Sequence, residues 1–217
     1  ELSGGKKFTD EQRQWIIQGA VDEDKAPRWL NHFFDPISGW GLNTPMLFVN
    51  GYSAKSWALS SKYQLAKLDQ ASTMGIIIAN QADPSSVPFV FSYEAGLQRY
   101  ARHQEKDAYL TLGHILHLVE DITVPEHTRN DAHPGWPRAS DYEIYTAKYS
   151  DNLNDNLSEE IFKQGYKPVA YTNLESYFDN LATYTNTHFF SPRTINMGYL
   201  APKIIYEDGT FAYGIDE

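Results

Sequence analysis

The chain has 217 residues, 41% of them apolar, which suffices for one sizeable core, so a single domain over residues 1–217 is expected. Its 28 acidic and 18 basic residues give a net charge of −10, which argues against a protein whose affinity depends on neutralising the phosphates of nucleic acid. The absence of cysteine excludes cysteine nucleophiles and thiolate metal sites.

The first predicted helix begins at Thr9, because Thr9 and Gln12 have the spacing of a capping box. Its apolar face is expected to consist of Trp15, Ile16, Gly19 and Ala20. An acidic run at 22–24 follows the helix. Acidic side chains at a helix C-terminus oppose the helix dipole, so this run is predicted to be either solvated or held by a cation.

The next segment of interest, 31–39, reads NHFFDPISG and contains His32. A histidine flanked by phenylalanine is usually a packing residue, so the neighbouring sequence alone does not make His32 a metal ligand. Asp35 is predicted to form the turn that Pro36 and Gly39 mark, rather than to bind a metal.

Apolar periodicity predicts three further helices, over 53–70, 92–103 and 107–122, separated at 71–88 by an irregular segment with one glycine and two prolines. His103 lies in a polar run and is predicted to face solvent. The helix over 107–122 is expected to be central and to pack through Leu110, Leu112, Ile115, Leu116 and Leu118.

Four of the seven histidines fall within the stretch 113–133, which reads GHILHLVEDITVPEHTRNDAH. His117 and Asp121 are four residues apart and would share one helix face, with His114 one turn earlier on the same stripe. Such a pair is often only a hydrogen-bonded histidine and aspartate. Alternatively, imidazole with carboxylate is a ligand set suited to zinc.

Val124-Pro125 is expected to end this helix, because proline lacks the backbone donor and disfavours helix in the residue before it. The chain would then turn and bring His127 and His133 round on a loop, so that imidazoles approach the helix face from a second direction. This arrangement would suit a closely spaced metal cluster.

The last third of the chain predicts helices over 141–157 and 173–188, and a β-hairpin over 203–213 with its turn at Asp208-Gly209. His188 is interpreted as structural, because no carboxylate or second histidine lies near it in sequence. The fold class is therefore predicted to be all-α, with one small C-terminal β-hairpin.

Three motifs occur in order along the chain: GAVDED at 19–24, NHFFDPISG at 31–39, and HxxxDxxxPxH from His117 to His127, followed by Tyr142-Glu143. Together they resemble the bacterial zinc-dependent phospholipase C family, whose superfamily also contains the fungal single-strand nucleases. The resemblance covers residues 19–143 and implies a multi-helix domain built around a zinc cluster.

The resemblance implies that Asp24, His32, His117 and Asp121 hold one zinc ion, with Asp121 able to bridge to another. It also implies a catalytic role for Asp24, which would orient or deprotonate the attacking water. Two or three zinc ions could then hold the phosphodiester oxygens and lower the pKa of a bound water, so that no protein nucleophile is required.

A second zinc ion would be held by His127 and Glu143 with a third residue. The family has a histidine four residues before the last carboxylate, where this chain has Ala139. His133 is the nearest replacement, and Asp131 or water is the alternative.

The third zinc of the family uses the amine of an N-terminal tryptophan and a histidine soon after it. This chain begins with Glu1 and has no histidine before His32, so a third zinc is left open. Because Glu1 is not an initiator methionine, the chain is expected to have been processed, which fits a secreted or periplasmic bacterial enzyme.

The function expected from the resemblance is a phospholipase C that cleaves phospholipids to diacylglycerol and a phosphorylated headgroup. Transient contact with a membrane surface would accompany this, although no apolar run approaches membrane-spanning length. The alternatives are a single-strand nuclease of the same superfamily and a catalytically inactive helical module stabilised by metal. Glu143 and the lack of cysteine disfavour the nuclease, because the nucleases use aspartate there and carry disulfides.

Overall fold

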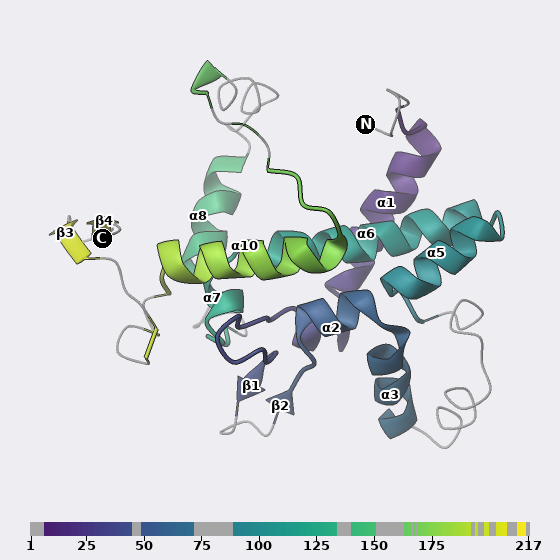
Figure 1. The fold of residues 1–217 in the computed structure, drawn as a ribbon, viewed down its shortest axis with the longest axis horizontal. Coiled ribbons are helices and arrows are strands. Elements are labelled where there is room, and N and C mark those ends of the chain that lie inside the picture. Colours follow the sequence, from purple (N-terminus) through teal and green to yellow (C-terminus); the bar gives the residue numbers. More distant parts are fainter. Residues whose placement is uncertain are drawn as a thin grey trace.

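The protein is mainly helical in the computed structural model, which confirms the predicted class at that level (Figure 1). The structure describes residues 7–44, 49–71, 89–133, 140–150, 163–165, 167, 169–191, 194, 198–199, 203–207 and 212–215. The predicted irregular segment 71–88 lies almost entirely outside these residues. Within them, no helix has the length and apolar character needed to cross a membrane.

Helix α1 (Asp10–Glu23) begins where the sequence predicts. The Thr9 backbone N–H donates to Gln12 Oε1 at 3.0 Å, and the Gln12 N–H donates to Thr9 Oγ1 at 3.1 Å, which completes the capping box. Asp24 is the C-cap residue. The helix therefore ends at the residue that the resemblance selects as a zinc ligand.

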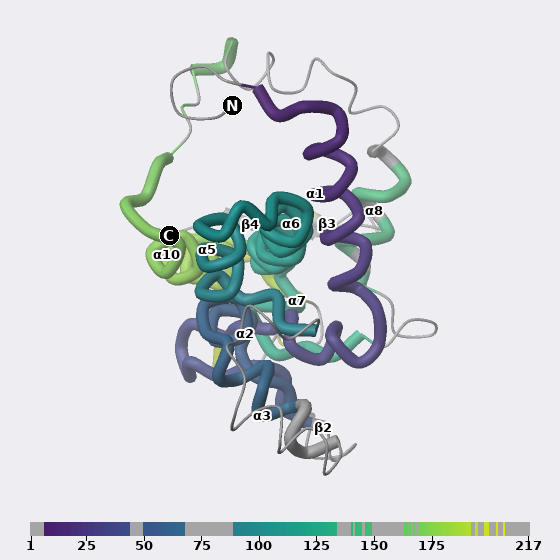
Figure 2. The backbone as a smooth tube through the Cα atoms, turned by 90° about the vertical axis from the view of Figure 1, so that its right-hand side faces the viewer, coloured from purple at the N-terminus to yellow at the C-terminus, as the bar shows by residue number. Residues whose placement is uncertain are grey.

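Helix α6 (Glu105–Asp121) is central, as predicted, and its two sides are covered differently. Figure 2 looks nearly along α6, with α1 on one side and both α5 (Tyr93–Ala101) and α10 (Leu174–His188) on the other. Ser92 and Asn173 cap α5 and α10, each accepting a bond from the backbone three residues on. Leu116 does not join the packing of α6, because it is 40% exposed.

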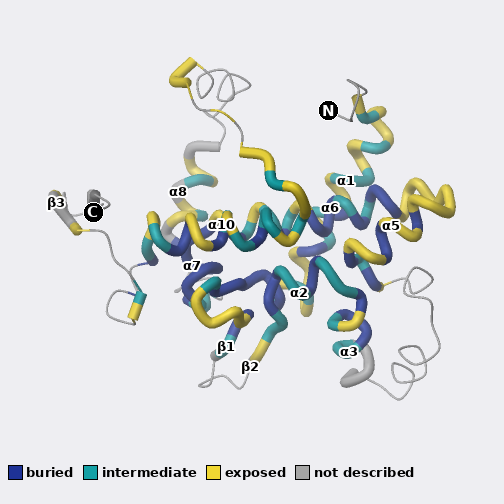
Figure 3. Tube along the Cα trace, viewed as in Figure 1, coloured by how far each residue is buried: buried dark blue, intermediate teal, exposed yellow. Residues whose placement is uncertain are grey.

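The main hydrophobic core lies where α2 (Ala54–Leu59), α6 and α10 meet. Figure 3 shows continuous burial through this region and through α7 (Pro125–Thr128). The buried side chains of this core are Phe34, Ala54, Trp57, Ala58, Leu118, Ile122, Phe178 and Ala182. The core thus holds the C-terminal end of α6 in place against two other helices.

The predicted helix over 53–70 is divided into α2 and α3 (Ser61–Ala71). Ser60 between them is extended, with φ −121° and ψ 130°. The Ser61 backbone N–H donates to the Glu94 carboxylate at 2.9 Å, and Gln64 Nε2 donates to the Trp57 carbonyl at 2.8 Å. These tertiary bonds replace the helical bonds that a continuous helix would make, so the periodic pattern alone could not reveal the break.

The remaining elements are short. They are η1 (Arg28–Asn31), β1 (Asn43–Thr44) paired antiparallel with β2 (Val49–Asn50), α7, α8 (Asp141–Ser150), and β3 (Lys203–Glu207) paired antiparallel with β4 (Ala212–Ile215). The turn between β3 and β4 lies outside the described residues, so the predicted Asp208-Gly209 hairpin turn stays a prediction.

Two glycines let α1 and α6 approach until their backbones touch. A Cβ added at Gly19 would overlap the carbonyl oxygen of Leu110, and one added at Gly113 would overlap that of Ile16. Both obstacles are helix backbone, which cannot move aside as a side chain can. The close approach fixes Asp24, at the end of α1, relative to the ligand candidates on α6.

We therefore expect Gly113→Ala to destabilise the fold by about 3 kcal/mol or more, since the two helices must separate. Urea unfolding followed by circular dichroism measures this. Gly96→Ala is the matched comparison, because its Cβ would meet side-chain atoms of Thr111, with the methyl at 2.9 Å, and no helix backbone. Equal stability of Gly113→Ala and the wild type would show that the helices are not held in contact.

Candidate metal centre

The C-terminal turn of α6 brings His117 and Asp121 together. His117 Nε2 lies 3.3 Å from Asp121 Oδ2, which confirms that the two side chains share one face. Both are largely buried, with side-chain exposures of 20% and 13%. The helix end therefore offers an imidazole and a carboxylate towards a single point.

His32 reaches the same point from η1, where it is the C-cap residue. Its Nδ1 lies 2.7 Å from Asp121 Oδ2, and its Nε2 lies 3.3 Å from the backbone carbonyl oxygen of Glu23. Asp24, His32 and His117 have donor atoms that all lie within 4.8 Å of one another, and we call these three residues the first ligand group. Imidazoles and a carboxylate from three elements thus converge, with Asp121 beside them.

His127, His133 and Glu143 form the second ligand group, whose donor atoms also lie within 4.8 Å of one another. His127 Nε2 and His133 Nε2 are 3.1 Å apart, and His133 Nε2 is 3.5 Å from Glu143 Oε2. Hydrogen bonding to His133 holds the pKa of Glu143 below its usual value. The structure thus places His133 beside Glu143, although Ala139 itself lies outside the described residues.

Helix α7 positions His127, where the sequence predicted a loop. Val124 is extended and Pro125 is the first helical residue, a position that tolerates proline because its missing N–H would have no partner there. The Phe34 backbone N–H donates to the His127 carbonyl at 2.9 Å and joins this helix to the segment that carries His32. The proline therefore ends one helix and starts another.

Phe33 packs against the second ligand group, a role that the sequence did not predict. Its ring lies against the second ligand group, with its centroid 4.6 Å from that of His127 and 5.7 Å from that of His133. Phe33 itself is buried. The position of Phe33 directly after His32 hints at a place near the metal ligands. Its ring partners, however, lie about a hundred residues further along the chain, so the sequence could not identify them.

Asp121 links the two ligand groups through a histidine ring. Its Oδ2 faces His32 and His117, whereas its Oδ1 lies 3.4 Å from His127 Nδ1. The opposite nitrogen of His127, Nε2, faces His133. Asp121 therefore lies between the two ligand groups, in contact with imidazoles of both, and the bridge between two metal ions that the resemblance implies stays a prediction.

Buried charge dominates this region. Burial alone would lower the pKa of His32, but contacts with Asp121 and Glu23 raise it to about 9. Burial likewise would raise the pKa of Asp121, but the charge of His127 and the contacts with three imidazoles hold it well below its ordinary value. Asp121 is therefore ionised.

The ligand groups fit divalent cations. His117 Nε2, Asp121 Oδ2 and His127 Nδ1 are buried and have no partner in hydrogen-bond geometry, even though charged atoms lie close to each. Burying such atoms unbonded is costly. Zinc with tetrahedral ligands about 2.0 to 2.1 Å away separates those ligands by about 3.3 Å, which is close to the spacings found here.

The other histidines and acids considered in the sequence have side chains outside both ligand groups, although the Asp131 backbone carbonyl oxygen lies 3.0 Å from His133 Nδ1. His114 contacts Glu23 through Nδ1 at 2.6 Å, so it does not join His117 as the stripe suggested. Asp131 is contacted by Ser191 Oγ. His103 is exposed as predicted, and His188 bonds locally to the carbonyl of Tyr184. Asp35 forms the predicted turn, accepting from the Ile37 N–H and the Ser38 hydroxyl.

No family model, curated protein or solved structure matches this chain. The resemblance to the phospholipases therefore stays a prediction carried by the three motifs. The two ligand groups stand independently of it, because they follow from the positions of the side chains.

Proposed function

We propose that this protein is a zinc-dependent phosphodiester hydrolase that acts on phospholipids, in the manner of the phospholipase C family that its motifs resemble. The observation that supports this most is the pair of imidazole–carboxylate ligand groups, with Asp121 in contact with histidines of both. Zinc bound there would supply a Lewis acid for the phosphoryl oxygens and lower the pKa of a bound water.

The exposure of the ligands indicates the side from which substrate approaches. Asp24 is exposed and the Glu143 side chain is 45% exposed, whereas His32 and His127 are buried. Solvent therefore reaches the site past one carboxylate of each group. In this proposal Asp24 would orient the attacking water or accept its proton, while the buried imidazoles would hold the ions.

A phospholipid is favoured over a nucleic acid by the net charge of −10, which would repel an extended polyphosphate. A zwitterionic headgroup is less sensitive to such repulsion. Transient contact with a membrane surface and a secreted or periplasmic location belong to the same proposal.

We expect the purified protein to hold two zinc ions per chain and to hydrolyse p-nitrophenylphosphorylcholine, losing both properties after treatment with a chelator and regaining them when zinc is restored. Elemental analysis and absorbance at the nitrophenolate band measure these. Less than one zinc per chain after zinc supplementation would overturn the proposal.

Two other outcomes of these assays would assign the protein a different function. Faster hydrolysis of single-stranded DNA than of phosphatidylcholine would assign the site to the nucleases of the same superfamily. Two bound zinc ions with no hydrolysis of any of these phosphodiesters would identify a helical module that uses the metal only to stabilise its fold.

A further inference from the structure

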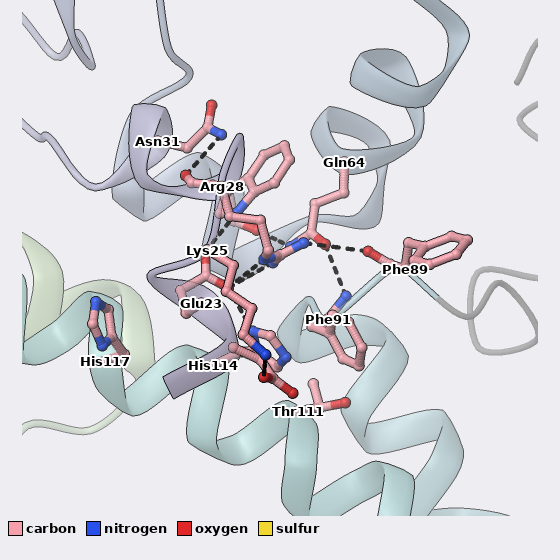
Figure 4. Close-up of polar contacts among 12 residues, drawn as sticks. Glu23, Lys25, Arg28, Asn31, Gln64, Phe89, Phe91, Thr111, His114 and His117 are labelled. Carbon is pink, nitrogen blue, oxygen red and sulfur yellow. Dashed lines mark hydrogen bonds and ion pairs between the residues drawn. The ribbon is translucent and has the colours of Figure 1, made fainter. Parts of the chain in front are cut away.

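A buried carboxylate, Glu23, lies directly behind the first ligand group. It occupies the last position of α1 and is fully buried. An ionised carboxylate is seldom buried without several partners, because removing it from water is expensive. The partners of Glu23 come from three other elements of the chain, as Figure 4 shows for the residues around it.

Each oxygen of Glu23 has its own partners. Oε2 accepts from Arg28 Nε at 2.7 Å and lies 2.6 Å from both Arg28 Nη2 and His114 Nδ1. Oε1 accepts from Trp57 Nε1 at 3.0 Å. Arg28 belongs to η1, Trp57 to α2 and His114 to α6, so one carboxylate joins four elements.

Aromatic rings close this network off from solvent. The His114 ring stacks on Phe91 with centroids 3.9 Å apart, and the Arg28 guanidinium lies over Trp57 and Phe91 at 5.1 and 5.3 Å. These stacking contacts fix the planes of the His114 imidazole and the Arg28 guanidinium. Glu23 is therefore rigidly held by groups that take no part in either ligand group.

This rigid residue controls two members of the first ligand group. Asp24 is its neighbour in the chain, so fixing Glu23 fixes the backbone from which Asp24 projects. His32 Nε2 lies 3.3 Å from the Glu23 carbonyl oxygen and 3.7 Å from its Oε1. Metal-binding histidines commonly donate their second N–H to such an oxygen, which sets the tautomer and the ring orientation.

We infer that Glu23, clamped by Arg28, His114 and Trp57, is the positioning residue of the first ligand group: it makes His32 donate from Nε2 and present Nδ1 to the metal. This inference rests on the proposed function only in requiring that the first ligand group binds zinc. The second ligand group has no contact with Glu23 among the described residues, so the effect is specific to one site.

The test is Glu23→Gln, which keeps the side-chain shape and removes the charge that clamps the network. We expect zinc affinity at the first site to fall by about 10- to 100-fold while the second site keeps its affinity, measured by competition with a chromophoric zinc chelator. Glu94→Gln is the matched control, because Glu94 bonds Ser60 and Ser61 far from the ligands. It should leave both affinities unchanged.

Trp57→Phe keeps the test decisive should Glu23→Gln fail to fold. It removes the bond to Oε1 and shrinks the ring under the Arg28 guanidinium, but it keeps the ion pair between Arg28 and Glu23 and an aromatic ring in the core. A smaller loss, again confined to the first site, supports the inference. Equal losses at both sites, or none, in a folded variant would overturn it and leave Glu23 a general structural residue. If the wild-type protein binds no zinc, the result would instead contradict the proposed function.

Discussion

Asp121→Ala is expected to abolish phosphodiester hydrolysis and to empty the first zinc site. Asp121 Oδ2 is the atom that both His32 and His117 contact. The substitution therefore removes the carboxylate that these two imidazoles share. The holoprotein should also melt at a lower temperature, because zinc binding contributes to the stability of the folded state.

The second site should respond more mildly to the same substitution. Its ligands remain, but His127 Nδ1 loses the carboxylate oxygen 3.4 Å away that orients its ring. Loss of such an orienting partner typically weakens metal binding by about 10- to 100-fold. A direct bridge between the ions would instead make both sites lose their metal together, so zinc titration of this variant separates the two arrangements.

The control is His103→Asn. His103 is exposed and has φ 59°, a backbone region that asparagine tolerates well, so zinc content, hydrolysis and melting temperature should all remain normal. Near-normal turnover by Asp121→Ala would show that hydrolysis takes place elsewhere on the protein.

Local spacing explains which parts of this molecule were predictable. The capping box at Thr9 and the shared face of His117 and Asp121 follow from regularities within one helix, and both were predicted correctly. The break at Ser60 was not, because it depends on Glu94, which lies 33 residues beyond the Ser61 N–H that it binds. Tertiary hydrogen bonds of this kind leave no periodic trace in the sequence.

The same distinction applies to the candidate site. The helical stripe suggested that His114 would accompany His117, but Glu23, 91 residues earlier, holds His114 in a separate buried network. Glu23 belongs to the acidic run at 22–24, which the sequence predicted to be solvated or held by a cation. Its partners Arg28 and Trp57 could be assigned only once the helices were placed, because ion pairing across elements depends on packing.

His133→Ala is expected to remove the second zinc and leave the first. His133 Nε2 lies 3.1 Å from His127 Nε2 and 3.5 Å from Glu143 Oε2, so without it only two of the three ligands remain. Hydrolysis should fall by about a hundredfold or more, because one cation alone cannot stabilise both the attacking and the leaving oxygen.

The variant also decides which residue stands in for the histidine that the family has at Ala139. Asp131, the alternative, is buried and its carboxylate is contacted by Ser191, so it would have to leave that contact to bind metal. His188→Ala provides the matched control, since this exposed histidine bonds to Tyr184 and Thr187 at the end of its own helix. Elemental analysis of both variants should give one zinc for His133→Ala and two for His188→Ala. Two zinc ions in His133→Ala would assign the position to Asp131 or to water, and would require the second ligand group to rearrange around Glu143.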